Sequence, residues 1–158
     1  FVKIKMQNPF DLKTDFKIAG YKSKLNFVNT GVPHVVVFVD KVNLIDIAKL
    51  GHFIRYHKHF HPQGANVNFV EIVENNKIML RTYERGVEGE TLACGTGATA
   101  SALLYALNYK VKSPIEVITR SNDILKIYYK SSHNSFNEVY LEGKVVKVFD
   151  GYYYDKYK

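Results

Sequence analysis

CGTGATASALLYAL, the sequence of residues 94–107, joins small residues to helix-favouring ones and contains no charged side chain. This composition predicts a helix from about Gly95 to Asn108. A helix that lacks a charged face has no side suited to water, so we expect it to be buried in the middle of the domain. The remaining elements must then surround it.

Segments with the composition and period of β-strands lie on both sides of this helix. We predict strands at Leu25–Asn29, His34–Val39, Val67–Val73, Lys77–Tyr83, Ile115–Thr119, Ile124–Lys130, Glu138–Leu141 and Val145–Phe149. Phe1–Met6 also alternates like a strand, Glu74–Lys77 reads as a hairpin turn, and Leu44–Phe60 has the pattern of an amphipathic helix. The expected fold class is α+β, with a mixed or antiparallel barrel-like sheet wrapped around a central buried helix.

Length and composition indicate one globular domain over residues 1–158, because 158 residues with 46% hydrophobic side chains can form one core and no linker divides them. Ser131–Asn137 is predicted to be a mobile hairpin loop. No apolar run approaches the ~18–20 residues of a membrane span. The single cysteine excludes an internal disulfide, which fits a reducing cytoplasm, the location that we expect.

The net charge of +7 and the pI near 9.3 raise the question of a nucleic-acid partner. The lysines are scattered along predicted strands and turns, and no recognition helix, zinc finger or aromatic RNA-binding signature is present. A solvated basic surface explains this pattern without a nucleic acid. A basic domain would also raise the local concentration of a dianionic small substrate.

Cys94, the only cysteine, stands where the loop turns into the predicted helix. The N–H groups of a helix start favour a thiolate over a thiol and can also hold a carboxylate. Gly95 and Gly97 expose such groups. Glu84 and the arginine after it follow the predicted strand Lys77–Tyr83, at the start of the loop that leads to Cys94. The alternative is that Cys94 is a small buried hydrophobic residue, which is common for a lone cysteine.

The run Tyr83–Gly97 resembles the second cysteine motif of the diaminopimelate epimerases. Asn29–Val37 is similar to the family's glycine-x-proline-histidine turn, and Gly64–Val70 is similar to its asparagine-bearing strand. Three ordered segments are far more specific than a lone cysteine and histidine. The resemblance covers nearly the whole chain but only the second half of a family member, and it implies the same fold, with a central helix that starts at the cysteine.

This resemblance implies a racemisation without a cofactor, in which two cysteines flank the α-carbon of the substrate. The chain contains one of them, so we expect residues 1–158 to be the C-terminal half of a two-domain epimerase whose other cysteine lies upstream of Phe1. Residues 151–158 would pack toward that absent N-terminal domain, although an exposed, frayed terminus is the simpler alternative.

Catalytic roles can be carried over by position. Cys94 would be one acid/base, with an expected thiol pKa below the reference value of about 8.5 in the assembled enzyme. Glu84 and His34 would be the polar groups that tune the pair of thiols. Without the motif, His34 would be read as a residue that satisfies local backbone groups at the mouth of a strand.

Substrate-binding roles are implied in the same way. Arg85 and Asn66 would hold the distal carboxylate and amine end, and the N–H groups of Gly95 and Thr96 would hold the α-carboxylate. Many family members have an asparagine where this chain has Val32, so one polar contact to the distal end is missing here or is supplied otherwise.

A metal site and two other functions are the alternatives to this interpretation. His57, His59 and His61 alternate, but no acidic or cysteine residue lies close enough in sequence to complete a metal site, so no metal or cofactor is expected. The rival functions are a cysteine hydrolase or transferase that uses Cys94 with His34 and a catalytically silent ligand-binding protein. The expected partners are a small amino diacid, the missing domain and, left open, a second copy in a homodimer, with no nucleic acid and no membrane.

Overall fold

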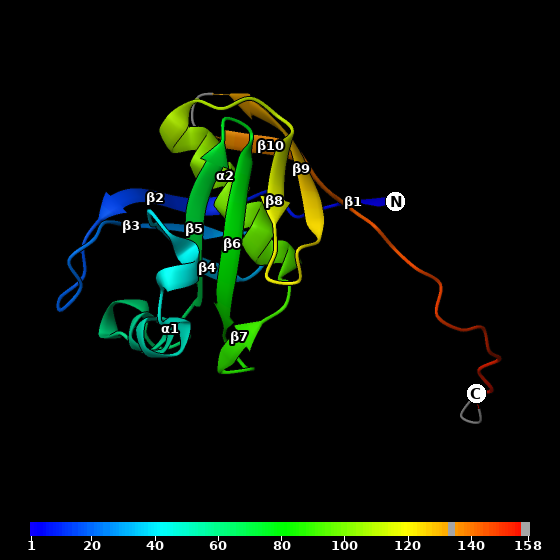
Figure 1. Cartoon of the computed structure of the whole chain (residues 1–158), viewed down its shortest axis with the longest axis horizontal. Coiled ribbons are helices and arrows are strands. Elements are labelled where there is room, and N and C mark those ends of the chain that lie inside the picture. The colour runs from blue at the N-terminus through cyan, green and yellow to red at the C-terminus, as the bar shows by residue number, and fades with distance from the viewer. Residues whose placement is uncertain (133–134, 156–158) are drawn as a thin grey trace.

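Ten strands and two α-helices make up the described part of the computed structural model, which comprises residues 1–132 and 135–155 (Figure 1). The helices are α1 (Ile47–Arg55) and α2 (Gly95–Tyr109), and two short 3-10 helices, η1 (Val42–Leu44) and η2 (Lys58–Phe60), flank α1. The strands are β1 (Val2–Lys5), β2 (Phe10–Phe16), β3 (Leu25–Asn29), β4 (Pro33–Phe38), β5 (Asn66–Glu74), β6 (Lys77–Glu84), β7 (Gly89–Thr91), β8 (Ile115–Ile118), β9 (Ile124–Ser132) and β10 (Ser135–Gly143).

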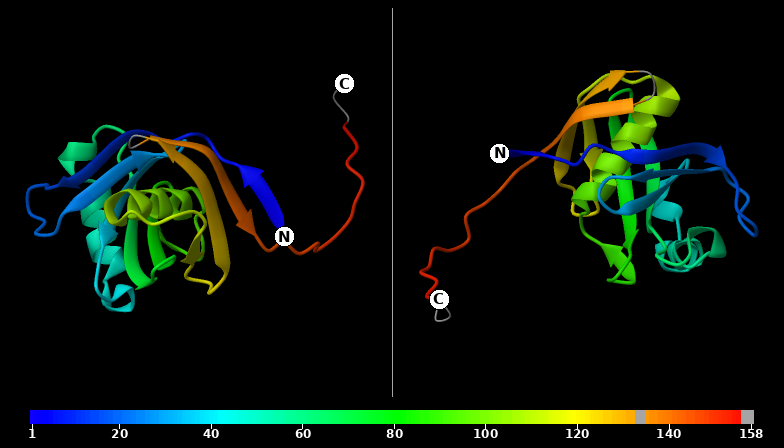
Figure 2. Two further views of the ribbon diagram at one scale, coloured as in Figure 1. Left: turned by 90° about the horizontal axis from the view of Figure 1, so that it is seen from above. Right: turned by 180° about the vertical axis from the view of Figure 1, so that it is seen from behind.

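The strands form one curled sheet in the order β1-β10-β9-β8-β6-β5-β4-β3-β2, with β7 paired to β6 off this path. The β4–β5 and β6–β8 pairs are parallel and the others are antiparallel. β1 and β2 lie at opposite ends of the order, yet only residues 6–9 connect them. An extended chain from Lys5 to Phe10 spans at most about 17 Å. The two edges must therefore approach each other, and the strands arch around α2 (Figure 2).

α2 is enclosed on all sides, as its sequence predicted. Every residue from Gly97 to Ala106 is buried, and the helix contacts β3, β4, β5, β6, β8, β9 and β10. Small side chains allow the strands to approach its backbone closely. At its far end the Tyr105 hydroxyl donates to the Asn75 carbonyl oxygen (2.8 Å), which ties the helix to the β5–β6 turn. The predicted α+β barrel-like sheet around a buried helix is confirmed.

Two hydrophobic clusters stabilise the domain. The inner one surrounds α2, and the outer one lies between the sheet and α1. The helix predicted over Leu44–Phe60 is shorter, because α1 begins after the N-cap Asp46 and ends at Arg55. Beyond it His57 is extended and Phe60 stacks on Phe27 with ring centroids 6.2 Å apart, so aromatic packing rather than helix continuation determines this segment.

Seven of the predicted strands are confirmed within a few residues, and β1 corresponds to the alternation noted at the N-terminus. The strand predicted at Val145–Phe149 is wrong, because these residues form neither strand nor helix. The last pair of the β1–β10 ladder is Val2 with Gly143, and no strand among residues 1–132 and 135–155 pairs with the residues that follow Gly143. Apolar residues without a partner strand do not make a sheet. β2 and β7 were not predicted.

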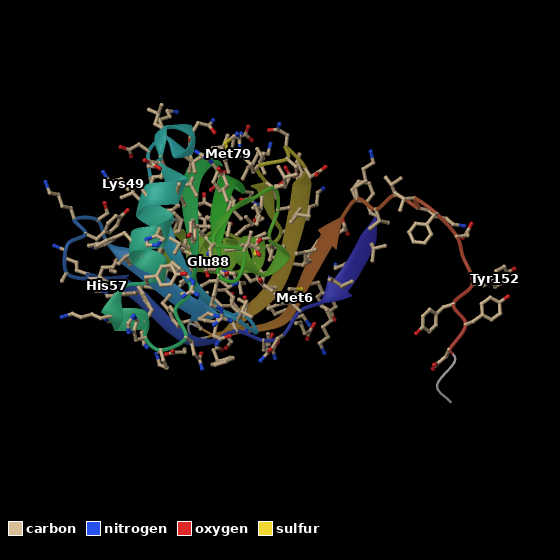
Figure 3. The ribbon with its side chains drawn as sticks, turned by 90° about the horizontal axis from the view of Figure 1, so that it is seen from below. Met6, Lys49, His57, Met79, Glu88 and Tyr152 are labelled. Atoms are coloured by element: carbon tan, nitrogen blue, oxygen red, sulfur yellow. The ribbon has the colours of Figure 1, made fainter. Side chains whose placement is uncertain are left out.

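Two predicted segments lie at the limits of the described residues. The hairpin loop predicted at Ser131–Asn137 is shorter than expected, because β9 continues to Ser132 and β10 begins at Ser135. Residues 133–134 lie outside the described part, and the mobility of the loop stays a prediction. Residues 144–155 are exposed along the tail, and Figure 3 shows Tyr152 well away from the body. Residues 156–158 are outside the described part, and packing of residues 151–158 on another domain stays a prediction. Within residues 1–132 and 135–155, no helix has the length and hydropathy needed to cross a bilayer.

We predict that Gly51→Ala destabilises the domain although alanine favours helices. A Cβ at Gly51 would lie 2.5 Å from the Tyr83 Cβ, where α1 packs on β6. The overpacking cost of about 1–3 kcal/mol exceeds a helix-propensity gain of at most ~1 kcal/mol. Urea unfolding should show a net loss of stability, whereas Gly89→Ala, which has open space around the new Cβ, should be nearly neutral. Equal stability of the two variants would contradict the close contact.

Candidate active site

The site forms at the end of the barrel where α2 begins. Side chains alternate along a strand, so residues two apart face the same way. On β5, Val67 and Phe69 belong to the outer core, whereas Asn68 faces inward toward α2, as does His34 on the parallel neighbour β4. Thr82 lies opposite Asn68 on β6 and donates its hydroxyl to the Asn68 side chain. Polar side chains from three strands are thereby collected around the first turn of α2.

Cys94 is the N-cap residue of α2. Its Sγ accepts a hydrogen bond from the Gly97 N–H (3.3 Å) and lies 3.5 Å from the Thr96 hydroxyl oxygen. The N–H groups of Gly95 and Thr96 have no acceptor in the described part of the chain. A helix start normally needs partners for such groups. The position therefore combines a sulfur atom with two free backbone donors, as the sequence predicted.

The protonation state of Cys94 in this chain depends mainly on burial. Burial raises the pKa of the thiol, and hydrogen bonds from Thr96 and Gly97 only partly offset this effect. The Glu84 carboxylate lies within hydrogen-bonding reach of the sulfur and raises the pKa further. In this chain Cys94 is thus held as a thiol. A lowered pKa in an assembled enzyme stays a prediction.

Glu84 is at the end of β6 and is held there by Thr91 of β7. The Thr91 hydroxyl donates to Glu84 Oε1 at 2.6 Å. β7 pairs with this end of β6, with Thr91 opposite Thr82. The short strand that was not predicted from the sequence therefore orients the carboxylate beside Cys94.

His34 is fully buried and neutral. Its Nδ1 lies 3.1 Å from Asn68 Nδ2, and its Nε2 has no partner in the described residues. Burial, followed by the positive charge of Arg85, lowers the pKa of His34 to about 3. An imidazolium is therefore strongly disfavoured at this position. The histidine can take part in hydrogen bonds but carries no charge at neutral pH.

Arg85 and Asn66 are joined through the backbone, because Asn66 Oδ1 accepts from the Arg85 N–H at 2.7 Å. The Arg85 guanidinium makes one long hydrogen bond, to the Gln63 carbonyl oxygen (3.4 Å). The other three arginines, Arg55, Arg81 and Arg120, pair with Glu88 or Glu90. Within the described residues, Arg85 is the arginine without a carboxylate partner, so its charge is available to a ligand.

The three alternating histidines have separate local contacts. His57 Nδ1 accepts from the His59 N–H at 3.2 Å, His59 stacks on Phe16 with centroids 5.3 Å apart, and His61 Nε2 lies 3.2 Å from the Tyr56 carbonyl oxygen. Among the described residues, no group of three or more metal-binding side chains comes together.

Four polar residues of the site were not singled out from the sequence. They are Thr30, whose hydroxyl donates to the Thr96 carbonyl oxygen (3.2 Å), and Asn68, Thr82 and Thr91. The available signal was the alternation of Asn66-Val67-Asn68, which places both asparagines on one face of a strand. Partners on other strands could not be found in that way.

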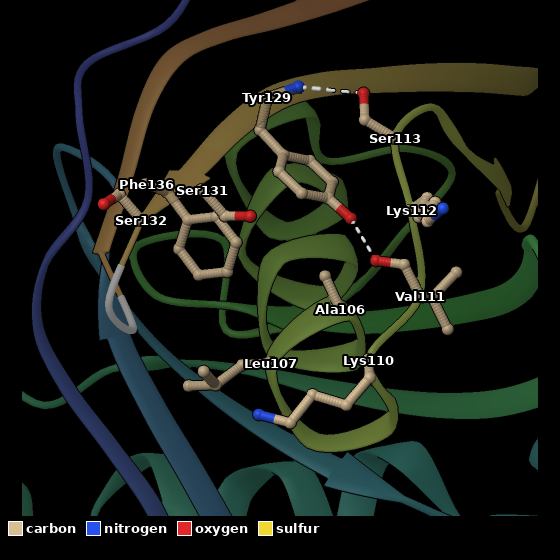
Figure 4. A pocket seen from close by; sticks show the side chains of 10 residues that line it. All are labelled: Ala106, Leu107, Lys110, Val111, Lys112, Ser113, Tyr129, Ser131, Ser132 and Phe136. Atoms are coloured by element: carbon tan, nitrogen blue, oxygen red, sulfur yellow. Dashed lines mark hydrogen bonds between the residues drawn. The ribbon is translucent and has the colours of Figure 1, made fainter.

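A separate hollow of about 320 Å³ lies at the opposite end of α2 (Figure 4). Tyr129 and Phe136 contribute aromatic rings to it, and Lys110 and Lys112 contribute basic side chains. The Tyr129 hydroxyl donates to the Val111 carbonyl oxygen at 2.6 Å. None of the residues predicted for the site lines this hollow.

Comparison with known proteins links this chain to a family. A family model described as diaminopimelate epimerase matches residues 26–148. The diaminopimelate epimerase of Aquifex aeolicus is 52% identical over 126 residues, which are 79% of this chain and 44% of that protein. The one from Hydrogenobaculum sp. is 45% identical over 148 residues, which are 92% of this chain and 50% of that protein. The chain spans about half the length of these relatives.

Solved structures share the fold. A hydroxyproline epimerase from Agrobacterium vitis has a TM-score of 0.70 at 16% identity and covers 90% of this chain and 49% of its own. A probable proline racemase from Agrobacterium radiobacter has a TM-score of 0.62 at 17% identity, over 93% of this chain and 53% of its own. At these identities the likeness concerns the fold. The family match over residues 26–148 shows that the chain belongs to the diaminopimelate epimerase family.

Proposed function

We propose that this chain provides one half of the active site of a cofactor-independent amino-acid epimerase, which interconverts LL- and meso-2,6-diaminopimelate. Relatives that carry the name diaminopimelate epimerase match 79–92% of the chain. The observation that carries the proposal is Cys94 at the start of the buried helix, beside Glu84 and two free N–H groups. Each part has a role in moving a proton at an amino-acid α-carbon.

The α-proton of an amino acid is very weakly acidic, so the carbanion-like transition state needs positive potential on the carboxylate. The N–H groups of Gly95 and Thr96 at the start of α2 would supply it. Cys94, held as a thiol by burial, is ready to deliver a proton to one face of the carbon. In the reverse direction its thiolate would remove that proton, with Glu84 close enough to influence the transfer.

Arg85 and Asn66 would bind the distal end of the substrate. An arginine without a carboxylate partner can form a bidentate pair with a carboxylate. The Asn66 Oδ1 is occupied by the Arg85 N–H, which leaves the Nδ2 group as its donor to a ligand. Val32 offers no polar group in the turn before His34, so recognition of the distal end rests on fewer contacts.

The hydrolase or transferase alternative is weakened by the neutral protonation states of His34 and Cys94. A cysteine nucleophile with a histidine partner works as a thiolate–imidazolium pair. Burial lowers the pKa of His34 to about 3 and raises the pKa of Cys94. Both shifts oppose such a pair. Proton transfer by a neutral thiol does not require it.

Inversion needs an acid or base on each face of the carbon, and this chain contains one cysteine. The proposal therefore includes a second cysteine on an N-terminal half, with residues 1–158 as the C-terminal half and residues 151–158 packed against the partner half. A homodimer and a cytoplasmic location belong to the same proposal. The reduced state needed by the two thiols fits that location.

The proposed function predicts that the chain alone has no epimerase activity. Deuterium incorporation into diaminopimelate in heavy water should require the N-terminal half of the Aquifex aeolicus relative, added in trans, and should be lost with Cys94→Ala. Water exclusion and the second thiol are absent from the open half-site. Robust inversion by the isolated chain would refute the two-cysteine mechanism. If both halves associate but never exchange the α-proton, the silent binding protein becomes the better interpretation.

We also predict that Glu84→Gln lowers the pKa of Cys94. The neighbouring carboxylate stabilises the protonated sulfur, so removal of its charge should favour the thiolate. The rate of iodoacetamide alkylation against pH reports this change directly, because Cys94 is the only thiol. Glu138→Gln changes an exposed carboxylate of β10 that pairs with Lys130, and this matched control should leave the alkylation curve unchanged. An unchanged or raised pKa in Glu84→Gln would contradict the proximity of the two groups.

Arg85→Ala should impair the reconstituted enzyme far more than it affects folding. Loss of a charge-assisted carboxylate contact costs on the order of 2–3 kcal/mol, or roughly 30- to 150-fold in kcat/KM. Arg120→Ala removes an exposed arginine that already pairs with Glu90 and should leave kcat/KM unchanged. Equal effects of the two substitutions would remove Arg85 from the substrate site.

A further inference from the structure

Two arginines from different elements donate to the same backbone oxygen beside the candidate site. Arg55 is the last residue of α1, and its Nη1 lies 3.4 Å from the Gln63 carbonyl oxygen. Arg85, directly after β6, donates from its Nη1 to the same oxygen at 3.4 Å. The two guanidinium groups must therefore lie close together, where their like charges repel each other. A carboxylate that reaches one of them is also near the other.

The Glu88 carboxylate lies at this point. Its Oε1 accepts from Arg55 Nη2 (3.0 Å) and from the Gly86 N–H (2.9 Å). The Glu88 N–H closes the turn after β6, because it donates to the Glu84 carbonyl oxygen at 2.8 Å. The hydrogen bond from Gly86, with a smaller contribution from Arg55, lowers the pKa of Glu88, so the carboxylate is charged at neutral pH. A charged carboxylate three residues after Arg85 thus pairs with Arg55 instead.

The surroundings of Arg55 point to a role for its charge. Its side chain is 13% exposed, and its Nε is buried without a hydrogen-bond partner among the described residues. Buried donors are normally paired, so this N–H has a cost in stability that an apolar side chain would not have. Gly64 leaves the space for the guanidinium, since a Cβ at that position would overlap Arg55 Nη1. The domain therefore keeps a cation at a position where packing alone does not require one.

Loss of Arg55 would leave Glu88 beside the guanidinium of Arg85. Glu88 and Arg85 belong to the same turn, and an arginine and a carboxylate in reach of each other form a charge-assisted pair. Arg85 would then have a partner from its own chain, which a ligand carboxylate would have to displace. Within the described residues Arg85 has no such partner, because Glu88 is already held by Arg55.

We propose that Arg55 is a positioning residue that holds the Glu88 carboxylate away from Arg85 and so keeps Arg85 free for a carboxylate of the substrate. The consequence for the substrate rests on the proposed epimerase function, whereas the pairing of the three side chains can be measured without any activity. The ligand class is a carboxylate that is remote from the reacting carbon.

The first test measures the reactivity of each arginine in the chain itself. Phenylglyoxal modifies unpaired guanidinium groups faster than those held by carboxylates, and mass spectrometry of the peptides gives the rate at each position. In the wild-type chain Arg85 should react faster than Arg55. Arg55→Met should slow the modification of Arg85, because Glu88 then pairs with it, and Arg55→Met/Glu88→Gln should restore the wild-type rate. An unchanged Arg85 rate in folded Arg55→Met, or a slow rate that persists in the double variant, would overturn the proposal.

Arg81→Met is the matched control. The Arg81 side chain is also 13% exposed and pairs with Glu90 of β7 at 2.6 Å, so its loss removes an equally buried ion pair from the same region. Glu90 keeps Arg120 as a partner at 3.5 Å, and the modification rate of Arg85 should stay at the wild-type value. An equal slowing of Arg85 in this control would assign the effect to loosening of the region and overturn the role of Arg55.

Kinetics of the reconstituted enzyme test the consequence for the substrate. Arg55→Met should raise KM for diaminopimelate about 5- to 10-fold, as expected for competition by one partly exposed arginine–carboxylate pair, with a smaller change in kcat. Arg55→Met/Glu88→Gln should return KM to near the wild-type value. A merely structural role of Arg55 would not allow this rescue, because the double variant also lacks the contact between α1 and the turn. A KM that stays raised in the double variant would refute the positioning role.

This proposal and the proposed function can fail separately. If the wild-type halves show no epimerase activity while the Arg85 rates change as expected, the proposed function fails and the separation of Glu88 from Arg85 by Arg55 stands. If Arg55→Met slows the modification of Arg85 but leaves KM unchanged in an active enzyme, Arg85 does not bind the substrate and the consequence for the substrate is overturned.

Discussion

The burial of α2 is the constraint on which the rest of the structure depends. A helix with no polar face must be surrounded, and here a single curled sheet surrounds it, with its two edges brought together by the short connection over residues 6–9. The start of such a helix still has backbone N–H groups that need partners. Cys94 satisfies one of them, and those of Gly95 and Thr96 have no acceptor among the described residues. The candidate site lies where the backbone donors of the enclosed helix are left without partners from the described residues.

Burial also determines the charges in this site. Cys94 and His34 are both held in their neutral forms, because each loses hydration that would stabilise its charged form. Arg85 keeps a charge that is not balanced by a carboxylate of the described chain. The Arg85 guanidinium and the Glu84 carboxylate are then the charged groups of the site, and the backbone donors at the start of α2 favour an anionic ligand there. The basic character of the whole chain adds a weaker, long-range contribution of the same sign.

The errors in the sequence-based prediction have a common physical origin. Local periodicity indicates that a segment can be a strand or a helix, but not whether a partner is present. Val145–Phe149 has a strand pattern but no partner strand among the described residues, whereas β7 has only three residues and exists because it pairs with β6. Likewise the helix predicted to reach Phe60 ends at Arg55, because Phe60 packs on an aromatic ring from a distant strand.

The order of the amino acids was sufficient to predict the buried helix, the strands that surround it, and the run that brings Glu84 and Arg85 near Cys94, because these features depend on neighbours along the chain. Tertiary structure decided the rest. The direction of the Cys94 pKa, the neutral His34 and the Asn68–Thr82 contact depend on which groups from separate strands are packed together and how much water they exclude. Desolvation and hydrogen-bond geometry are properties of the folded chain, and no local pattern contains them.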